Sequence, residues 1–488
     1  MPDFQSLRET YPKDPDFPDR THRLLALTRV LDGTLYELLK VPFGDEKNGA
    51  GEYVPLAERR PSARTRFCHT VVNDSVSMLF SEGHFPSVDC ADEQTREALG
   101  QLKKESKLNA IMIDAAIRGS VGSICIYMRI LKGRIFYVVL PTAYLTPTWD
   151  PEEPDRLLKV EERYKVKGQA LKDSGYAIDK DDMNVDFWFT RVWNENAEVW
   201  HLPQKKNAPL IEDLQRTTIH KLGFVPMVWI KNLPGGEGCD GAPTFPEEAI
   251  DTQIEADYLL SQGGRGLKYG SDPTLLLKEP AFAGAQVVKG AANAIVTSIE
   301  GDAKLLEITG DSAHAIIEWV KALREIALEG MGGNRANAEK LSAGQSGRAM
   351  ELLDKALCSL ADRLKTQYGE GALRDLLVMI VKASNKVPLK DLQGLDVPKM
   401  NAKEKIGLRW PAWYPPTFAD SNTQALTLQV LRESNLIAIE TAVKSIANTY
   451  DVPDIAVELA AIKKDTPPDP VAVKTEKPKA PSLSESQD

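Results

Sequence analysis

Apolar residues recur at helical spacing in two long segments between about Asp311 and Lys386. In the first segment these positions are Ile316, Ile317, Val320, Leu323 and Ala327. In the second they are Met350, Leu353, Leu357, Leu360 and Leu364, followed by Leu373, Leu376, Leu377 and Ile380. Gly369 and Gly371 interrupt the second segment, so we expect a kink or a short break there. The pattern predicts two amphipathic helices.

A glycine-rich segment from Gly330 to Gly347 joins these two helices. Gly330, Gly332 and Gly333 can adopt positive φ and end the first helix. A connection of this length inside an ordered protein is usually functional or disordered. We expect either a helical hairpin with a mobile lid or a loop that projects into a channel.

The chain before these helices combines helical and strand periodicity. Helices are predicted over about 20–39, 63–80 and 93–119. Strand-like runs rich in β-branched and aromatic residues begin at Ile124, Arg134, Leu157, Asp186 and Glu198. The fold class that follows is α+β and helix-rich.

A further helix is predicted over 246–270, after a capping box formed by Thr244 and Glu247. Four short strand candidates follow within 271–310, at 274–278, 286–289, 294–297 and 303–308. The order is helix, small β-rich insertion, helix. We therefore expect two antiparallel helices with the insertion at their far end.

Several motifs occur in a definite order along the chain. They are Ile219-His-Lys-Leu-Gly-Phe-Val-Pro-Met-Val-Trp-Ile-Lys-Asn, Glu247-Glu-Ala-Ile-Asp-Thr-Gln-Ile-Glu-Ala-Asp, Ser346-Gly-Arg-Ala-Met-Glu-Leu-Leu, Ala361-Asp-Arg-Leu-Lys-Thr-Gln-Tyr-Gly-Glu-Gly, Trp410-Pro-Ala-Trp-Tyr-Pro-Pro-Thr-Phe-Ala-Asp and Leu431-Arg-Glu-Ser-Asn-Leu-Ile-Ala-Ile-Glu-Thr-Ala. In this order, from about Arg60 to Asp465, they resemble the portal proteins of tailed bacteriophages, the head-to-tail connectors.

The resemblance implies a subunit of a cyclic, dodecameric ring with wing, stem, clip and crown parts. It divides the chain into an N-terminal segment and α+β wing (1–245), a stem helix (246–270), a clip (271–310), a second stem helix (311–332), a tunnel loop (333–346), a long wing helix with a closing wing strand (347–415), a helical crown (416–464) and a flexible tail (465–488). Double-stranded DNA would pass through the ring non-specifically during packaging and ejection.

The resemblance also suggests three groups of site residues. The tunnel-loop residues that would touch DNA phosphates are Asn334, Arg335, Asn337, Lys340 and Gln345. The channel-lining stem candidates are Glu318, Lys321, Glu325 and Glu329. The clip candidates for partner docking are Lys278, Lys289 and Lys304.

The implied partners are the terminase motor, the major capsid and scaffolding proteins, and the head-completion or adaptor proteins. The implied location is the portal vertex of the capsid in the virion, with the host cytoplasm as the site of assembly. ATP hydrolysis would belong to the terminase, so we expect a non-enzymatic chain without cofactor or metal.

Composition independently limits the domain number and the class of protein. With 488 residues, 42% hydrophobic and 27% charged, the chain is long enough for several well-cored domains. No apolar run approaches the roughly 18 residues that span a membrane, and the N-terminus lacks an apolar signal region. We expect an intracellular product that does not enter the membrane.

The net charge of −10 is the opposite of the basic footprint of proteins that bind nucleic acid tightly. Between Glu247 and Ser346 there are 15 acidic and 9 basic residues, a net charge of −6. A channel through which duplex slides should avoid strong phosphate neutralisation. An acidic lumen and an ordinary solvated helix face explain this charge equally well.

Residues suited to catalysis or metal binding form no recognisable pattern. Five cysteines lack Cys-x-x-Cys spacing, and we expect them to be reduced and mostly buried. Gly236-Glu-Gly-Cys-Asp-Gly241 fits the dinucleotide fingerprint, but its carboxylates would face a pyrophosphate, so a turn is the better interpretation. The acidic turn at 150–155 is better explained as solvated loop than as a cation site.

Two alternatives remain open at this stage. One is a nucleotide- or substrate-binding enzyme whose lid is the glycine-rich loop, which predicts a monomer or dimer. The other is a cytosolic scaffold, which predicts low-order assembly without a central hole.

Overall fold

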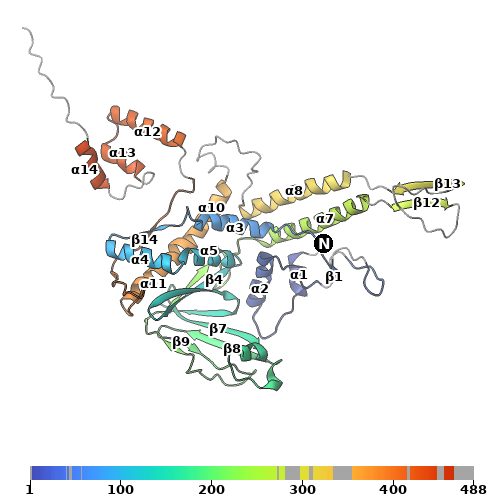
Figure 1. Ribbon diagram of the computed structural model, residues 1–488, viewed down its shortest axis with the longest axis horizontal. Coiled ribbons are helices and arrows are strands. Elements are labelled where there is room, and N and C mark those ends of the chain that lie inside the picture. Colours follow the sequence, from blue (N-terminus) through green and yellow to red (C-terminus); the bar gives the residue numbers. More distant parts are fainter. Residues whose placement is uncertain are drawn as a thin grey trace, which may run out of the picture. The chain divides into compact units, whose positions relative to one another are not determined.

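The computed structural model describes residues 3–39, 41–42, 47–55, 58–271, 274–280, 297–306, 311–333, 354–414, 418–447 and 455–465. It is a mixed α+β protein, as the sequence predicts (Figure 1). The chain forms two compact units: residues 1–341 with 351–413, and residues 342–350 with 414–488. Within the described residues, no helix is long and apolar enough to cross a membrane.

Except for two short helices at residues 4–10 and 168–173, which the sequence pattern did not predict, the helices of the first unit lie in the predicted segments. The helices of this unit are α1 (Phe4–Thr10), α2 (Asp19–Asp32), α3 (Phe67–Phe80), α4 (Glu93–Glu105), α5 (Leu108–Gly119), α6 (Gly168–Asp173), α7 (Glu247–Ser271), α8 (Asp311–Met331), α10 (Lys355–Leu364) and α11 (Arg374–Ser384). The helix predicted from 20 ends early because Gly33 adopts a φ of 75°. The one predicted over 93–119 splits in two, because Lys107 lies in the left-handed region.

Two antiparallel sheets of three and five strands form most of the β part of this unit. One has the order β11-β4-β5, with β11 (Met227–Lys231), β4 (Ser123–Leu131) and β5 (Arg134–Pro141). The other has the order β10-β9-β8-β7-β6, with β10 (Thr218–Ile219), β9 (Ala197–Trp200), β8 (Asp186–Trp193), β7 (Leu157–Lys167) and β6 (Leu145–Trp149). The first six residues of β4 are all buried, so this strand lies in the core.

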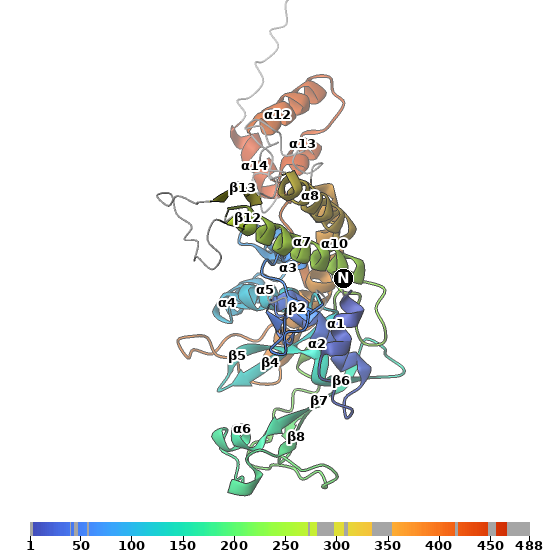
Figure 2. The same ribbon diagram turned by 90° about the vertical axis from the view of Figure 1, so that its right-hand side faces the viewer.

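Helices α7 and α8 run side by side as a hairpin, with β12 (Thr274–Pro280) and β13 (Thr297–Leu306) beyond them (Figures 1 and 2). These two strands pair antiparallel, with Lys278 opposite Asp302. The predicted order of helix, β-rich insertion and helix is therefore confirmed for the described residues. The strand candidate at 286–289 lies outside them.

The start of α7 differs from the predicted capping box. The helix begins at Glu247, and the amides of Ala249 and Ile250 bond to the carbonyl of Pro246. The Thr244 hydroxyl instead accepts a hydrogen bond from the Asn232 side chain at 3.0 Å. The predicted capping box is wrong, because the helix begins after Pro246 and Thr244 lies too early to cap it.

The break predicted at the paired glycines is present as a π-helix, Lys365–Leu373, between α10 and α11. Gly369 lies directly against the indole ring of Trp410, so that a Cβ atom at this position would overlap it. The neighbouring Tyr368 is fully buried, and its hydroxyl is 3.2 Å from the Asn232 side-chain oxygen. The widened helical turn lets the indole approach the backbone closely.

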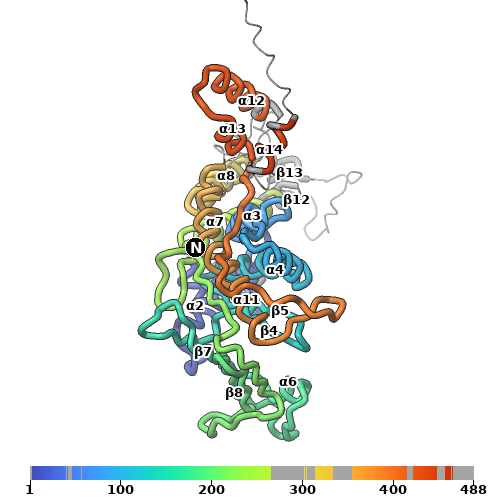
Figure 3. The backbone as a smooth tube through the Cα atoms, turned by 90° about the vertical axis from the view of Figure 1, so that its left-hand side faces the viewer, coloured from blue at the N-terminus to red at the C-terminus, as the bar shows by residue number. Residues whose placement is uncertain are grey.

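The N-terminal part of the chain lies beside α7 (Figure 3). Hydrogen bonds hold it there. Asp257 is fully buried and accepts bonds from the Thr65 amide at 2.7 Å, the Thr65 hydroxyl at 2.9 Å and the Tyr36 hydroxyl at 2.9 Å. One turn later, the Ser261 hydroxyl accepts from two further amides, those of Ser62 and Ala63. Residues spaced by four lie on one helix face, so these partners form a single row.

The second unit contains α12 (Phe418–Glu433), α13 (Ile439–Ile446) and α14 (Ile455–Asp465). The helical character predicted for 416–464 is confirmed in its described residues. Among these, the buried apolar side chains are Val443 and Ala447. The strand β14 (Gly407–Arg409), which precedes this unit, pairs antiparallel with β3 (Ser87–Asp89).

Replacing Asp257 by Asn should change how stability depends on pH. Burial raises the pKa of Asp257 from 3.8 to about 6. The folded state then holds a proton that the unfolded chain releases, so this group's stabilisation is fully present below pH 4 and is lost as pH rises through 6. Relative to the wild type, the free energy of unfolding of Asp257→Asn should rise by up to about 3 kcal/mol between pH 4 and 7. Urea unfolding at four pH values measures this, and parallel profiles would contradict it.

Replacing Gly369 by Ala should destabilise the first unit by about 1–3 kcal/mol, because the added methyl group must displace the Trp410 ring. Gly371→Ala, in the same π-helix, is the matched control. A Cβ atom there would meet only the Thr366 carbonyl oxygen, at 3.4 Å. Thermal unfolding should show a lower midpoint for the first variant alone. Equal midpoints would show that the indole contact imposes no constraint.

Candidate functional site

The residues of α8 divide into groups around the helix axis. Successive residues are rotated by about 100°, which places Val320, Leu323 and Ala327 on one buried row. The four residues predicted to line a channel are exposed and lie on the opposite face: Glu318, Lys321, Glu325 and Glu329. The helical spacing seen in the sequence therefore does bring them together.

The charged face is acidic and carries a single lysine among these four residues. Lys321 donates a hydrogen bond to Glu318 at 2.8 Å. This bond lowers the pKa of the Glu318 carboxyl group. Both side chains are exposed, so water screens the pair and its contribution to stability is small.

Apolar side chains flank this charged face on both sides. Trp319 and Ile326, seven residues apart, lie on one flank and are 50% and 54% exposed. Ile317 lies on the other flank and is 44% exposed. The sequence pattern placed Ile317 in the buried row, and this is wrong, because α7 covers too narrow a strip of α8 to reach it. The Trp319 indole contacts α7 through a 3.4 Å hydrogen bond to Glu255.

Helix α8 ends at the glycines that the sequence predicted would end it. Gly332 has a φ of 69°. The Gly333 amide bonds to the Leu328 carbonyl at 2.7 Å, which satisfies an acceptor of the last turn. The five tunnel-loop residues, Asn334, Arg335, Asn337, Lys340 and Gln345, lie outside the described residues.

The three clip lysines are described to different extents. Lys304 on β13 is exposed, and its ammonium group is 3.5 Å from the Asp302 carboxylate. Lys278 stands opposite Asp302 in the strand register. Lys289 lies outside the described residues. Lys278 is thus placed opposite Asp302 by the antiparallel register, and Lys304 lies near it two residues along the same strand.

Acidic residues of α7 serve a purpose that the sequence did not reveal. Asp251 accepts a hydrogen bond from the Phe4 amide at 2.6 Å, and Glu247 forms an ion pair with Arg8 at 3.4 Å. Together with the buried Asp257, they hold the N-terminal segment. Part of the acidic excess after Glu247 is therefore internal and does not contribute to an exposed acidic surface.

A buried ionic cluster, also without a sequence signal, joins the two sheets. Glu198 on β9 is buried and accepts hydrogen bonds from Tyr127 at 2.7 Å and Arg191 at 3.3 Å. Arg191 also pairs with Glu162 at 2.8 Å and stacks on Trp193. Each charged group named here has a partner, so the cluster holds β4, β7, β8 and β9 in position.

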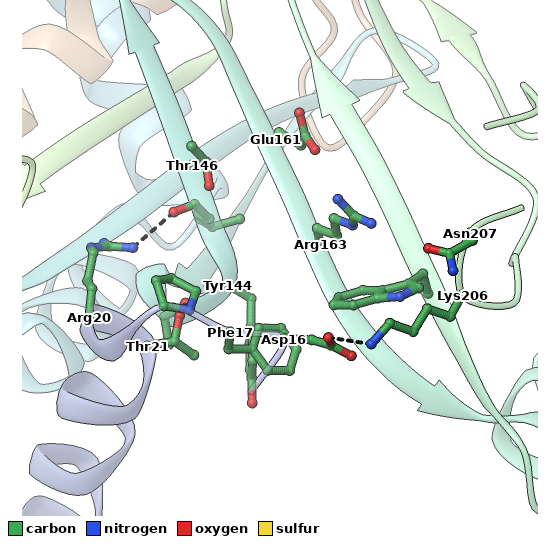
Figure 4. A pocket seen from close by; sticks show the side chains of 14 residues that line it. Asp16, Phe17, Arg20, Thr21, Tyr144, Thr146, Glu161, Arg163, Lys206 and Asn207 are labelled. Carbon is green, nitrogen blue, oxygen red and sulfur yellow. Dashed lines mark hydrogen bonds and ion pairs between the residues drawn. The ribbon is translucent and has the colours of Figure 1, made fainter. Parts of the chain in front are cut away.

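A cavity of about 390 Å³ lies where the segment before α2 meets β6, β7 and β8 (Figure 4). Its charged groups are already engaged. Lys206 pairs with Asp16 at 2.7 Å, and the Arg163 guanidinium stacks on Trp188 at 4.4 Å. No histidine, cysteine or serine lines this cavity.

A larger cavity of about 1770 Å³ lies between the 147–157 turn, β11 and α11, and it too has no histidine, cysteine or serine in its lining. Arg156 pairs with Asp150 at 3.7 Å. No group of three or more metal-ligating side chains occurs among the described residues.

The two sequence features suspected of ligand binding are turns, as predicted. In the dinucleotide-like stretch, Asp240 is buried and its carboxylate accepts two bonds from Arg20, at 2.7 and 2.8 Å. Ser123 donates a third. Four of the five cysteines are buried, and all five are free.

The sequence was compared with protein families and with curated proteins. No protein-family model matches the sequence, and no curated protein matches it significantly.

Proposed function

We propose that this chain is a portal subunit of a tailed bacteriophage, one copy in a ring-shaped channel for double-stranded DNA. The observation that carries the proposal is the division of α8 into a buried row, an exposed charged face and two exposed apolar flanks. The order of motifs along the sequence points to the same family.

The division of α8 suits a ring. A helix that packs against α7 on one side and exposes Trp319 and Ile326 on a flank leaves apolar surface in water. Neighbouring copies placed side by side around an axis would cover both flanks at once, since a cyclic interface joins two different surfaces of each subunit. The remaining charged face, with Glu325 at its centre, would then face the axis.

The charge of that face suits the passage of DNA. Tight nucleic-acid binding comes from neutralising many phosphates with Lys and Arg, and the four channel-lining candidates include only Lys321. The acidic surface would keep the duplex from adhering. Arg335 and Lys340 in the glycine-rich loop would supply brief phosphate contacts at the narrowest point.

The hairpin of β12 and β13 would form the clip, the part that faces the terminase motor during packaging and the head-completion proteins afterwards. Lys304 is exposed there beside Asp302. The helices of the second unit would form the crown. In this proposal the ring sits at one capsid vertex in the virion and assembles with the capsid and scaffolding proteins.

Ring formation is the first expected result. Electron microscopy of the purified full-length chain should show end-on rings with an axial opening wide enough for a DNA duplex. A monomer or dimer at every protein concentration would contradict the proposal.

The change Ile326→Lys should weaken the ring, because it places a charge in the apolar contact between copies. Burying an isoleucine contributes roughly 1.5–3 kcal/mol, so the concentration needed for assembly should rise at least about tenfold. Glu325→Lys introduces the same residue one position away on the charged face and should leave assembly intact. Light scattering on a sizing column measures both. Equal loss of rings would show that the flank is not an interface.

Removing the charges of Arg335 and Lys340 together should leave the rings intact but impair packaging or retention of DNA. The matched control removes Lys403 and Lys405, which are a pair of basic residues outside the loop. Packaged DNA per particle, measured after nuclease treatment, should fall only for the loop variant. Normal packaging by that variant would exclude the phosphate contact while leaving the ring in place.

A further inference from the structure

The two edges of the five-stranded sheet are built differently. On one edge β6 contains Pro147, which has no N–H group to offer an additional strand. The other edge consists of β10 and of residues 210–213, which continue alongside the end of β9. Its chain carries no proline between Leu210 and Ile219.

At Glu212 the backbone hydrogen-bonding groups point away from the sheet. The Leu202 amide bonds to the Ile211 carbonyl at 2.8 Å, and the Asp213 amide bonds to the Trp200 carbonyl at 2.7 Å. These bonds flank the pair His201 and Glu212. In an antiparallel ladder, each residue of a pair flanked in this way points its N–H and C=O groups away from the partner strand. For Glu212, this is the open side of the sheet edge. Within the described part of the chain, neither backbone group of Glu212 has a hydrogen-bond partner.

Ile219 in β10 has the same orientation. It lies opposite Ala197, and the His220 amide bonds to the Asn196 carbonyl at 2.9 Å. By the same ladder rule, the N–H and C=O of Ile219 face outward. The edge therefore offers unpaired backbone groups at two places.

Large aliphatic side chains surround these groups. Leu210 is 52% exposed, Ile211 54%, Leu214 79% and Ile219 66%. Natural proteins usually protect sheet edges with charge, proline or a covering element, because an open apolar edge is a template for another strand. Here Glu212 is the exposed carboxylate among four exposed aliphatic residues, since the neighbouring Asp213 is buried and pairs with Arg216.

We propose that the first part of this edge, residues 210–213, binds an extended segment of a partner protein by β-strand addition; a turn at 214–216 separates it from β10. The fitting segment places a lysine or arginine opposite Glu212, with aliphatic residues two positions to either side. A second copy of this chain fits poorly. Antiparallel self-pairing centred on Glu212 would set two carboxylates directly opposite each other, which is destabilising.

The test uses the full-length chain and the capped peptide Thr-Val-Thr-Lys-Thr-Val-Thr, with its central lysine opposite Glu212. Amide hydrogen exchange in residues 208–216, measured by mass spectrometry, should slow about tenfold when about nine tenths of the chain carries peptide. The same peptide with an N-methyl group on the lysine amide should give no protection, because that N–H would bond to the Glu212 carbonyl.

Charge reversal identifies the position of binding. Glu212→Lys should lose the protection, whereas Glu82→Lys, at an exposed glutamate on another element, should keep it. Three results would overturn the proposal: no protection by the peptide, equal protection by its N-methylated form, or protection that rises with the concentration of the chain alone. The last result would assign the edge to a second copy.

Discussion

The burial of Asp257 is the constraint on which the arrangement of the first unit depends. A carboxylate inside a protein is tolerated only with hydrogen-bond donors around it, and Thr65 and Tyr36 supply them from the N-terminal segment. The helix and that segment must therefore be assembled together. Ser261, one turn further along, continues the same row, whereas Asp251 accepts the Phe4 amide on another side of α7.

The N-terminal segment and α8 pack on different sides of α7. Because one side of α7 is occupied by the N-terminal segment, α8 packs along another side, through Val320, Leu323 and Ala327. Only a narrow strip of α8 is covered. The exposed flanks with Trp319 and Ile326 result from that narrow contact, and they are what the proposed ring would cover.

A second constraint comes from the π-helix. Tyr368 and Gly369 bring the long helix against two distant parts of the chain, the Asn232 side chain and the Trp410 ring. At residue 369 any residue other than glycine would place its Cβ atom inside the Trp410 ring. The glycine is required there by the close approach of the indole, and not by its dihedral angles.

The sequence by itself determined the features that depend on local periodicity. Helical spacing located α8 and the charged face from Glu318 to Glu329, and runs of β-branched and aromatic residues located β4, β5, β7 and β8. Glycines marked the end of α8 and the break near Gly369. The sequence shows such patterns because neighbours on the same face are only three or four residues apart in a helix and two residues apart in a strand.

Only the tertiary structure decided which residues are covered and by what. Asp257 and Glu198 look like ordinary surface acids in the sequence, yet both are buried, because their donors come from segments far away along the chain. Ile317 fits the buried row by spacing alone, but the width of the contact with α7 leaves it exposed. Long-range contacts carry no periodicity, so burial and pairing had to be observed in the fold.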